Sequence, residues 1–299
     1  MVCPVAGRDV AVVAVDWWGQ GPAHMRKLIG DALTESPAEN RPPKKSWTSG
    51  FAAFYEALTG DFRGDVPMYL EMAKRHEGPI LELACGTGRV AIPLAEAGST
   101  VVGLDSDPEM LALAESKSRM LDLRRRISFV EAEMESFKMK QKFPLIIAGA
   151  NSLIHLLTSE KLEKCLVRCR EQLDKDGTLY IAFEPSPYLA AAGKYRVERE
   201  RPRQVFNREI GETLLYRGTT TVDPNFQLIV RHHEYANPRA PHDATKTATF
   251  NYSTRPIYPG ELEVLMKSVG LEVKEIYGDY DLRLLTRQSE KIIYRIQRA

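Results

Sequence analysis

Five short apolar runs recur through the middle of the chain, and amphipathic segments lie between them. The runs occupy residues 80–84, 100–104, 127–131, 145–150 and 178–183. The segments at 90–97, 108–121 and 159–173 repeat apolar residues at intervals of three and four, as a helix with one buried face does. Because strands that alternate with helices build a parallel sheet covered on both faces, the pattern predicts an α/β domain.

The pattern changes after residue 183. Three runs near 213–222, 227–235 and 246–254 alternate between apolar and polar positions, which is typical of strands with one buried face. Asp223-Pro224-Asn225 is a turn sequence between the first two runs. A helix at 260–269 that ends at Gly270 comes next, and strands at 272–277 and 291–297 follow it. We therefore expect an antiparallel insertion after the fifth strand.

The first 47 residues differ from the rest. A short apolar run at 10–15 is followed by Trp17 and Trp18 and then by a polar, proline-rich stretch. Helical periodicity begins near residue 49, and a second helix is expected from Asp65. The predicted organisation is an extension with a linker at 1–47, a main domain formed by 48–194 and 259–299, and the insertion at 195–258.

The composition of the chain disfavours nucleic acids and membranes as partners. The 41 basic and 40 acidic residues nearly cancel, so no strong field favours nucleic acid or an anionic membrane. No apolar run reaches the ~20 residues of a membrane span, and the run at 10–15 is too short for a signal peptide. The four cysteines show no disulfide framework spacing, which favours a reduced compartment. We expect a cytoplasmic protein with no nucleic-acid or membrane partner.

A strand runs directly into a glycine turn at 79–89, whose sequence is PILELACGTGR. Glycine lets the backbone approach a ligand where a Cβ atom would clash. Asp105 ends the next apolar run, seventeen residues after Gly88, and an acid at that position can bind both hydroxyls of a ribose. Together these features predict a nucleotide cofactor.

Two nucleotide cofactors compete for this turn. The spacing Gly86-x-Gly88-x-x-Ala91 satisfies the dinucleotide fingerprint used for NAD. Against NAD, the turn lies some eighty residues into the chain and Glu82 lies inside the preceding strand. The string from Glu82 to Gly88 instead resembles motif I of class I S-adenosylmethionine-dependent methyltransferases, and the resemblance extends from about Tyr55 to the C-terminus.

This resemblance implies a fold and a substrate class. The fold is a Rossmann-like sheet of seven strands in which the last strand returns antiparallel. The chain is most similar to small-molecule N-methyltransferases of the amino-sugar N,N-dimethyltransferase type, which also carry an antiparallel sheet between the fifth and sixth strands. In those relatives the inserted sheet forms a cap that supplies the acceptor pocket.

The resemblance also implies cofactor contacts. In the family, the acid in the strand and the backbone of the turn hold the methionyl amino and carboxyl groups. Ala84 stands where the family usually has its first glycine, and it adds only one methyl group. Asp105 matches the motif II acid that accepts hydrogen bonds from the ribose. The predicted cofactor-binding residues are Tyr55, Glu82, Ala84, Gly86, Gly88, Asp105, Ser106, Met110, Glu133, Met134 and Asn151.

The adenine contacts leave alternatives open. Met110 is expected to pack on the adenine ring, although a role as an ordinary core residue fits its spacing as well. Glu133 and Met134 correspond to the acidic and hydrophobic pair that binds adenine in relatives. Glu131 and Glu135 are neighbouring candidates for the acidic position.

The fourth strand leads to the predicted reaction centre. The chain has no Asn-Pro-Pro-Tyr sequence, which disfavours methyltransferases for DNA adenine and for glutamine. His155 matches a histidine at the active site of small-molecule relatives, and a histidine can take the proton that an amine or hydroxyl acceptor must lose. A purely structural histidine is the alternative. Tyr55 resembles a lid tyrosine near the reacting centre, with a core aromatic as its alternative.

The second predicted strand of the insertion places Arg231 and His233 on one face and His232 on the other, so only one of the adjacent histidines can face a ligand. The predicted acceptor-binding residues are Tyr69, His155, Arg231 and His233. We expect no metal site, because Cys165 and Cys169 are spaced four residues apart, as residues of the buried stripe of a helix are.

The sequence therefore predicts a methyltransferase that uses S-adenosylmethionine on a small-molecule acceptor, with N-methylation favoured over O-methylation. One alternative is a protein or RNA methyltransferase, which needs a basic or open groove. Another is a non-catalytic, cofactor-binding regulatory protein that docks through Trp17 and Trp18. The sequence leaves a homodimer open.

Overall fold

The structure is a computed structural model that describes residues 11–12, 51–59, 62–186, 196–207, 211–241 and 247–299. The chain divides into two compact units. The first unit comprises Met1–Leu58 and Ala191–Thr254, and the second comprises Thr59–Ala190 and Arg255–Ala299. Trp17 and Trp18, in the predicted extension, lie outside the described residues.

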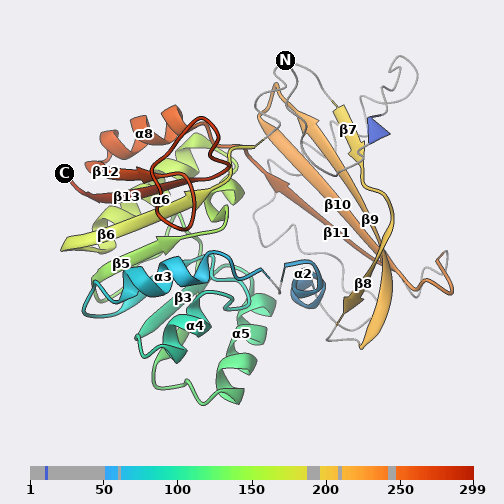
Figure 1. The fold of residues 1–299 in the computed structure, drawn as a ribbon, viewed down its shortest axis with the longest axis horizontal. Coiled ribbons are helices and arrows are strands. Elements are labelled where there is room, and N and C mark those ends of the chain that lie inside the picture. The colour runs from blue at the N-terminus through green and yellow to red at the C-terminus, as the bar shows by residue number, and fades with distance from the viewer. Residues whose placement is uncertain (1–10, 13–50, 60–61, 187–195, 208–210, 242–246) are drawn as a thin grey trace. The chain divides into compact units, whose positions relative to one another are not determined.

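The second unit is built on a seven-stranded sheet with the order β12-β13-β6-β5-β2-β3-β4 (Figure 1). The sheet consists of β2 (Ile80–Leu83), β3 (Val101–Asp105), β4 (Ile127–Glu131), β5 (Phe143–Ala148), β6 (Leu173–Phe183), β12 (Leu271–Tyr277) and β13 (Ile292–Arg298). The first five strands pair in parallel, and β13 is antiparallel to both of its neighbours. The predicted Rossmann-like class I methyltransferase sheet is confirmed.

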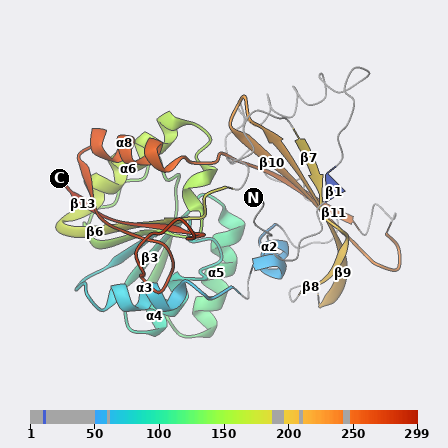
Figure 2. The same ribbon diagram turned by 45° about the horizontal axis from the view of Figure 1, so that its top comes forward.

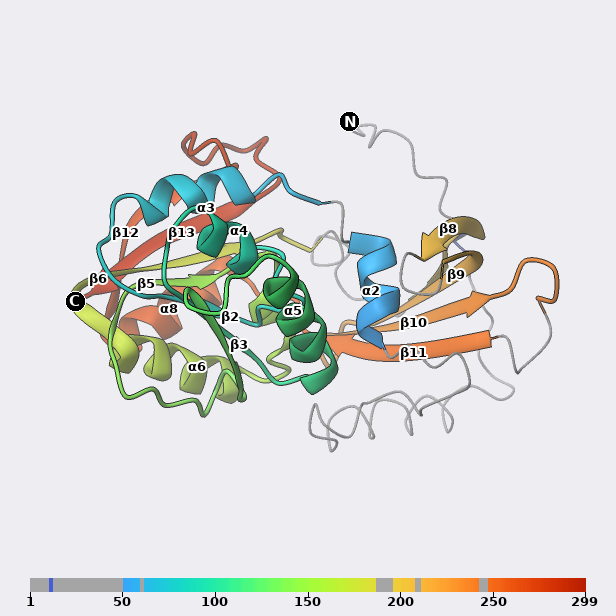
Figure 3. The same ribbon diagram turned by 90° about the horizontal axis from the view of Figure 1, so that it is seen from below.

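Helices cover both faces of this sheet (Figure 3). They are α3 (Val66–Ala73), α4 (Ala91–Glu96), α5 (Pro108–Met120), α6 (Ser159–Gln172) and α8 (Pro259–Ser268). Successive strand residues point to opposite faces, so Leu81 joins the core under α6 and α8 while Ile80 joins the core under α3 and α4. This two-sided burial explains why the strands read as continuous apolar runs.

Helix α6 illustrates how the sequence determines where a helix begins and which of its faces is buried. The Thr158 side chain accepts a hydrogen bond from the Lys161 N–H and caps the helix. Leu162, Cys165 and Cys169 then recur on one buried face. Both cysteines are free and buried, as the predicted helix stripe requires.

The first unit contains an antiparallel sheet with the order β1-β7-β9-β10-β11, and β8 also pairs with β9 (Figure 2). Its strands are β1 (Ala11–Val12), β7 (Arg196–Arg199), β8 (Arg203–Asn207), β9 (Glu212–Asp223), β10 (Leu228–Ala236) and β11 (Thr247–Thr254). The predicted antiparallel insertion is confirmed. Asn225 N–H donates to the Asp223 carboxylate in the predicted turn between β9 and β10.

The sequence pattern did not predict strands β7 and β8. Both pair with β9 and are dominated by charged or polar residues. Strands near a sheet edge tolerate such residues because one side of the strand stays in water, so they lack the apolar alternation that marks a strand.

Helix α2 (Phe51–Thr59) supplies the apolar cover of this sheet. The Phe54 ring lies 4.7 Å from Tyr235 and 4.9 Å from Phe250, between ring centroids. With Leu214 and Val205, these rings form the buried cluster of the first unit. The helix that the periodicity predicts from about residue 49 is therefore present, and its apolar face packs on the sheet.

Among the helices that the structure describes, none is both long and apolar enough to cross a membrane.

Candidate active site

The turn after β2 places two glycines in left-handed conformations for different reasons. Gly86 has φ +54°, and a Cβ atom there would meet no heavy atom within 4 Å. Gly88 has φ +81°, and a Cβ atom there would lie 2.8 Å from Cδ1 of Ile92 in α4. Gly86 therefore leaves its backbone open to a ligand, whereas Gly88 lets the helix pack closely against the turn.

Ala84 corrects one expectation about this turn. From the sequence alone, the change from glycine is expected to add only one methyl group. The structure gives Ala84 φ +50°, a left-handed conformation that costs an L-residue roughly 1–2 kcal/mol. The departure from the family pattern therefore changes backbone strain as well as volume, and such strain gathers at functional turns.

Asp105 ties the turn to the neighbouring strand. Its Oδ2 accepts a hydrogen bond from the Gly86 N–H at 2.8 Å, and its Oδ1 accepts one from the Asp107 N–H at 2.9 Å. Burial raises the pKa of Asp105, and the N–H groups of Asp107, Gly86 and Ser106 oppose that rise. Each carboxylate oxygen can accept a further bond, so Asp105 can hold the turn and still bind hydroxyl groups.

The three acidic residues at and after the end of β4 differ in burial and in their charged neighbours. Lys161 lies 2.9 Å from Oε1 of Glu135, and Glu131 is exposed at the end of the strand. Glu133 is half-buried; burial and then Glu135 raise its pKa, with a further contribution from Asp105. Glu133 is thus half-buried and near enough to Asp105 to be influenced by its charge, and its contact with adenine stays a prediction.

The methionines predicted at the adenine are both buried. Met110 lies in the first turn of α5, and Met134 packs in the core under α6 and α8. Ser106 is half-buried directly after Asp105. The structure thus places these residues on the segments that follow β3 and β4, and their contact with adenine stays a prediction.

A strained turn follows β5. Ala150 and Asn151 have φ +48° and +67°, and this ends the strand at Ala148, two residues before the predicted end. The Asn151 N–H donates to the Ala182 carbonyl at 3.1 Å, and its side-chain oxygen accepts from the Glu184 N–H at 2.7 Å. Asn151 therefore joins the ends of β5 and β6. Left-handed non-glycine residues cost about 1–3 kcal/mol each and are characteristic of functional sites.

This turn leads into a short 3₁₀ helix, η1 (Ser152–His155), whose last residue is His155. The Ile154 carbonyl accepts a hydrogen bond from the Arg255 N–H at 2.7 Å, which anchors the helix. His155 itself is exposed, just beyond the carboxyl end of β5. Open parallel sheets place ligands at this edge, so His155 lies where a reacting group can meet it.

Glu82 and Tyr69 lie in the interior of the second unit. Glu82 in β2 is 6 % exposed, and burial raises its pKa to about 8. Tyr69 in α3 is fully buried, and its hydroxyl would lie 2.5 Å from a Cβ atom on Gly149, just after β5. The structure thus brings the predicted cofactor residue Glu82 and the predicted acceptor residue Tyr69 to adjoining elements.

A buried ion pair next to this position went unnoticed in the sequence. Arg89 directly follows the turn and binds both carboxylate oxygens of Asp65, one of them at 2.8 Å. Asp65 is fully buried before α3. Paired arginine and carboxylate groups of this kind fix geometry, so the pair anchors α3 beside the turn. The signal that could have found it is the arginine at the end of the motif string.

Arg231 and His233 lie together on the buried face of β10, as predicted. The His233 Nδ1 lies 3.0 Å from the Tyr216 hydroxyl oxygen, and its ring stacks on Tyr252. Burial, and then Arg231 and His232, lower the pKa of His233 to about 4. His233 is therefore neutral at pH 7. His232 points to the other face and contacts Asn251.

Tyr55 belongs to α2 in the first unit, with its ring 5.9 Å from Phe51 and its side chain 36 % exposed. Its role as a lid stays a prediction, as does acceptor binding by Arg231 and His233. Across the part of the chain that the structure describes, no group of three or more His, Cys, Asp or Glu side chains could hold a metal ion.

Known proteins match this architecture. A family model described as a methyltransferase domain matches residues 80–177. The chain is 23 % identical to the putative methyltransferase YqeM of Bacillus subtilis over 252 residues, which cover 84 % of this chain and 96 % of that protein.

Two solved structures share the fold. The CcbJ methyltransferase of Streptomyces caelestis superposes with a TM-score of 0.69 at 23 % identity, covering 86 % of this chain and 99 % of that one. The sugar N-methyltransferase KedS8 of a Streptoalloteichus species superposes with a TM-score of 0.60 at 18 % identity, covering 82 % of this chain and 92 % of that one. At these identities the superpositions show a common fold.

The described residues fit S-adenosylmethionine, the cofactor that the sequence predicts. Gly86 leaves its backbone open to a ligand, and Asp105 can accept hydrogen bonds from ribose hydroxyls. The Glu82 Oε2 atom is buried with no hydrogen-bond partner among the described residues, which suits the positively charged amino group of the cofactor. Glu133 can accept from the adenine amino group. When bound, the cofactor supplies a methyl group already activated on a sulfonium.

Proposed function

We propose that this chain, an S-adenosylmethionine-dependent methyltransferase, methylates an amino group of a small molecule. The observation that carries the proposal is the position of His155, exposed at the end of η1 and just beyond the strained turn of Ala150 and Asn151. The resemblance to amino-sugar enzymes supports it, as does the name of KedS8, a sugar N-methyltransferase.

The chemistry assigns a different task to each residue. Asp105 binds the ribose of the cofactor and Glu82 its amino group, and the backbone at Gly86 lies against the cofactor. His155 accepts the proton that an ammonium acceptor must lose before its nitrogen has a lone pair. Because the methyl donor is already activated, alignment and proton removal are the main contributions that the protein must make.

The test is a product analysis with the purified full chain. The protein is incubated with S-adenosylmethionine and matched sets of small amines, small phenols, a protein mixture and RNA. We expect S-adenosylhomocysteine to form with members of the amine set, with a product one methyl group heavier and the new methyl on nitrogen by NMR. Product from the phenols alone would contradict N-methylation, and product from protein or RNA alone would contradict a small-molecule acceptor.

The inserted sheet gives a second expected result. We propose that Arg231 and His233 contact the acceptor, because Arg231 is half-buried on the same face of β10 as His233 and lies beside Tyr252. Replacing Arg231 with alanine is expected to raise the acceptor KM roughly tenfold or more, since a charged hydrogen bond contributes about 1.5–3 kcal/mol. Cofactor affinity stays unchanged.

His232→Ala is the matched control, since His232 lies on the opposite face of the same strand. It is expected to leave the acceptor KM at the parental value. If Arg231→Ala and His233→Ala change the association state in solution while the acceptor kinetics stay parental, the sheet is an interface between copies of the chain and the proposal for these residues is wrong.

A further inference from the structure

A buried histidine nitrogen in the inserted sheet has no hydrogen-bond partner among the described residues. His233 in β10 is 7 % exposed, and the unpartnered atom is its Nε2. The other ring nitrogen, Nδ1, lies 3.0 Å from the Tyr216 hydroxyl oxygen. Folded proteins pair the great majority of their buried polar side-chain atoms. An open nitrogen on a ring that is otherwise held in place therefore indicates that a bound molecule supplies the missing partner.

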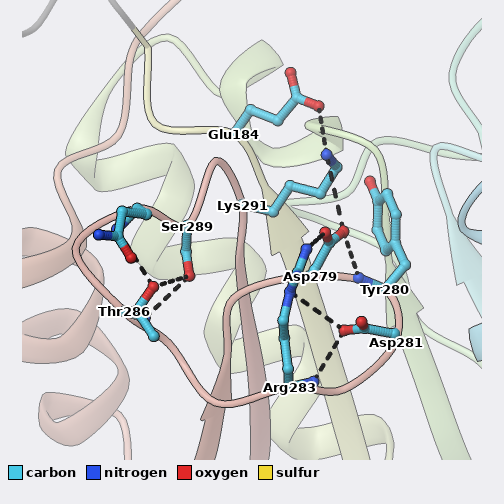
Figure 4. A network of polar contacts seen from close by, with 9 residues as sticks. Glu184, Asp279, Tyr280, Asp281, Arg283, Thr286, Ser289 and Lys291 are labelled. Carbon is cyan, nitrogen blue, oxygen red and sulfur yellow. Dashed lines mark hydrogen bonds and ion pairs between the residues drawn. The ribbon is translucent and has the colours of Figure 1, made fainter. Parts of the chain in front are cut away.

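The polar network in the loop after β12 offers a contrast, because its charged groups are all paired (Figure 4). Lys291 lies 3.8 Å from Glu184 and 4.0 Å from Asp279. Asp279 also binds Arg283, which lies 3.6 Å from Asp281. Each charged side chain named here has another as its partner, so this network needs no ligand. The imidazole in β10 differs, because only one of its two nitrogens is paired.

Tyr216 lies between His233 and a carboxylate. It is 2 % exposed in β9, and its hydroxyl oxygen lies 3.3 Å from Oε1 of Glu200, an exposed residue just after β7. Gly218 lies opposite His233 in the pairing of β9 with β10. A Cβ atom on Gly218 would lie 2.5 Å from the Tyr216 hydroxyl oxygen and 2.7 Å from Glu200 Oε1. The absence of a side chain at Gly218 therefore provides the space in which Tyr216 reaches Glu200.

One arrangement of protons satisfies all three polar groups. A carboxylate can only accept a hydrogen bond, so Tyr216 donates to Glu200 and accepts from the N–H at His233 Nδ1. The reverse order would leave the oxygens of Tyr216 and Glu200 3.3 Å apart with no proton between them. Burial and Glu200 raise the pKa of Tyr216, so its hydroxyl keeps its proton. Burial, and then Arg231 and His232, lower the pKa of the His233 ring to about 4, so it carries one proton at pH 7.

Arg231 limits the kind of group that can meet Nε2 of His233. It precedes His233 by two residues on the same face of β10 and is half-buried, so a ligand can approach from this side. Arg231 donates to the Thr254 hydroxyl oxygen at 2.8 Å and has further N–H donors. Its positive charge disfavours an ammonium beside Nε2. A hydroxyl group suits both residues, because its O–H can donate to Nε2 while its oxygen accepts from Arg231.

We propose that Glu200 and Tyr216 hold the proton of His233 on Nδ1, and that Nε2 accepts a hydrogen bond from a hydroxyl group of the methyl acceptor. Glu200 and Tyr216 act through His233 and are positioning residues. The His233 ring stacks on Tyr252 with 5.2 Å between ring centroids, and this stacking fixes the plane in which Nε2 lies. The inference rests on the proposed role of His233 in acceptor binding. It adds that the amine acceptor also carries a hydroxyl group.

The first test is ¹⁵N NMR of the full chain labelled at histidine, because the shifts and couplings of the ring nitrogens identify the one that carries the proton. His233→Gln assigns the signals. At pH 7 we expect the parental chain to carry the proton on Nδ1. Glu200→Ala frees the Tyr216 hydroxyl to donate to Nδ1, so we expect the proton to move to Nε2. Glu234→Ala, which removes an acid from the opposite face of β10, is the matched control and should keep the parental pattern.

The second test is kinetics with the amine found by product analysis and with its analogue that lacks the hydroxyl group. Tyr216→Phe keeps the buried ring, and we expect it to raise the acceptor KM roughly threefold to tenfold, the effect of one hydrogen bond. Cofactor affinity should stay unchanged, and the analogue should have equal KM values with parent and variant. Tyr235→Phe is the matched control and should keep the parental KM. It removes a buried hydroxyl that also lacks a partner in the described part of the chain but belongs to a ring packed on Phe54.

Four results would overturn the proposal. They are a proton on Nε2 of His233 in the parental chain, a parental NMR pattern in Glu200→Ala, a parental acceptor KM in Tyr216→Phe, and an acceptor without a hydroxyl group. The NMR measurement needs no acceptor. If the proposed N-methylation fails, the position of the proton on His233 is still measured, so the two failures are distinguishable.

Discussion

Replacing His155 with alanine is expected to lower kcat by roughly 10²–10⁴-fold, the usual contribution of a general base. His155 is exposed at the end of η1, and its backbone neighbour Ile154 is anchored by Arg255. Removing the imidazole therefore leaves the local backbone in place, and substitutions at exposed positions seldom change stability by more than about 0.5 kcal/mol. Cofactor affinity should stay parental. The measurement is steady-state kinetics with the acceptor identified by product analysis, supported by a thermal melt.

A pH profile distinguishes a base from a merely positioned histidine. If His155 takes the acceptor's proton, the parental kcat falls on the acid side as the imidazole becomes protonated, and this limb disappears in His155→Ala. His155→Gln, which keeps a polar side chain, should be as slow as the alanine variant. A near-parental kcat in either variant would show that His155 has a structural role.

Replacing Asp105 with alanine is expected to weaken cofactor binding by about 2–4 kcal/mol, which is roughly 30-fold to 1,000-fold. The variant loses the acceptor of two charge-assisted hydrogen bonds to the ribose. It also loses the bond from the Gly86 N–H at 2.8 Å, which holds the glycine turn against β3. Calorimetry with S-adenosylhomocysteine measures the loss directly.

Asp107→Ala is the matched control for Asp105→Ala. The Asp107 side chain caps α5 by accepting from the Glu109 N–H at 2.8 Å. Its removal should cost about 0.5–2 kcal/mol of stability and leave cofactor affinity close to parental. Equal affinities for the parent and Asp105→Ala, or a clear preference for NAD, would contradict the assignment of this carboxylate.

The main sheet was predictable because its burial is nearly complete on both faces. All four residues of β2 are buried, so the run reads as apolar except for Glu82, and that exception marks the site. The antiparallel strands β9 and β10 were predictable for the opposite reason, since one face is buried and the other carries Arg217 and Glu234 as an ion pair.

The site was only partly predictable because its geometry depends on contacts between elements. The sequence placed Gly86 and Asp105 near the same ligand, but the hydrogen bond between them arises from the pairing of β2 with β3. The left-handed backbone of Ala84 could not be predicted, because alanine as a residue type gives no indication of a positive φ. Tyr69 looked like an acceptor contact on an amphipathic helix, and only the packing of α3 places its hydroxyl against Gly149, next to β5.

A crystal structure of the full chain with S-adenosylhomocysteine would test the central claim most directly. We predict ribose hydroxyls within hydrogen-bond distance of Asp105, the backbone of Gly86 against the ligand, and the amino group on Glu82 Oε2. The sulfur, where the methyl group is attached in the substrate form, should face the turn from Asn151 to His155. A ligand whose ribose lies away from Asp105, or whose sulfur is turned from that segment, would contradict this account of the site.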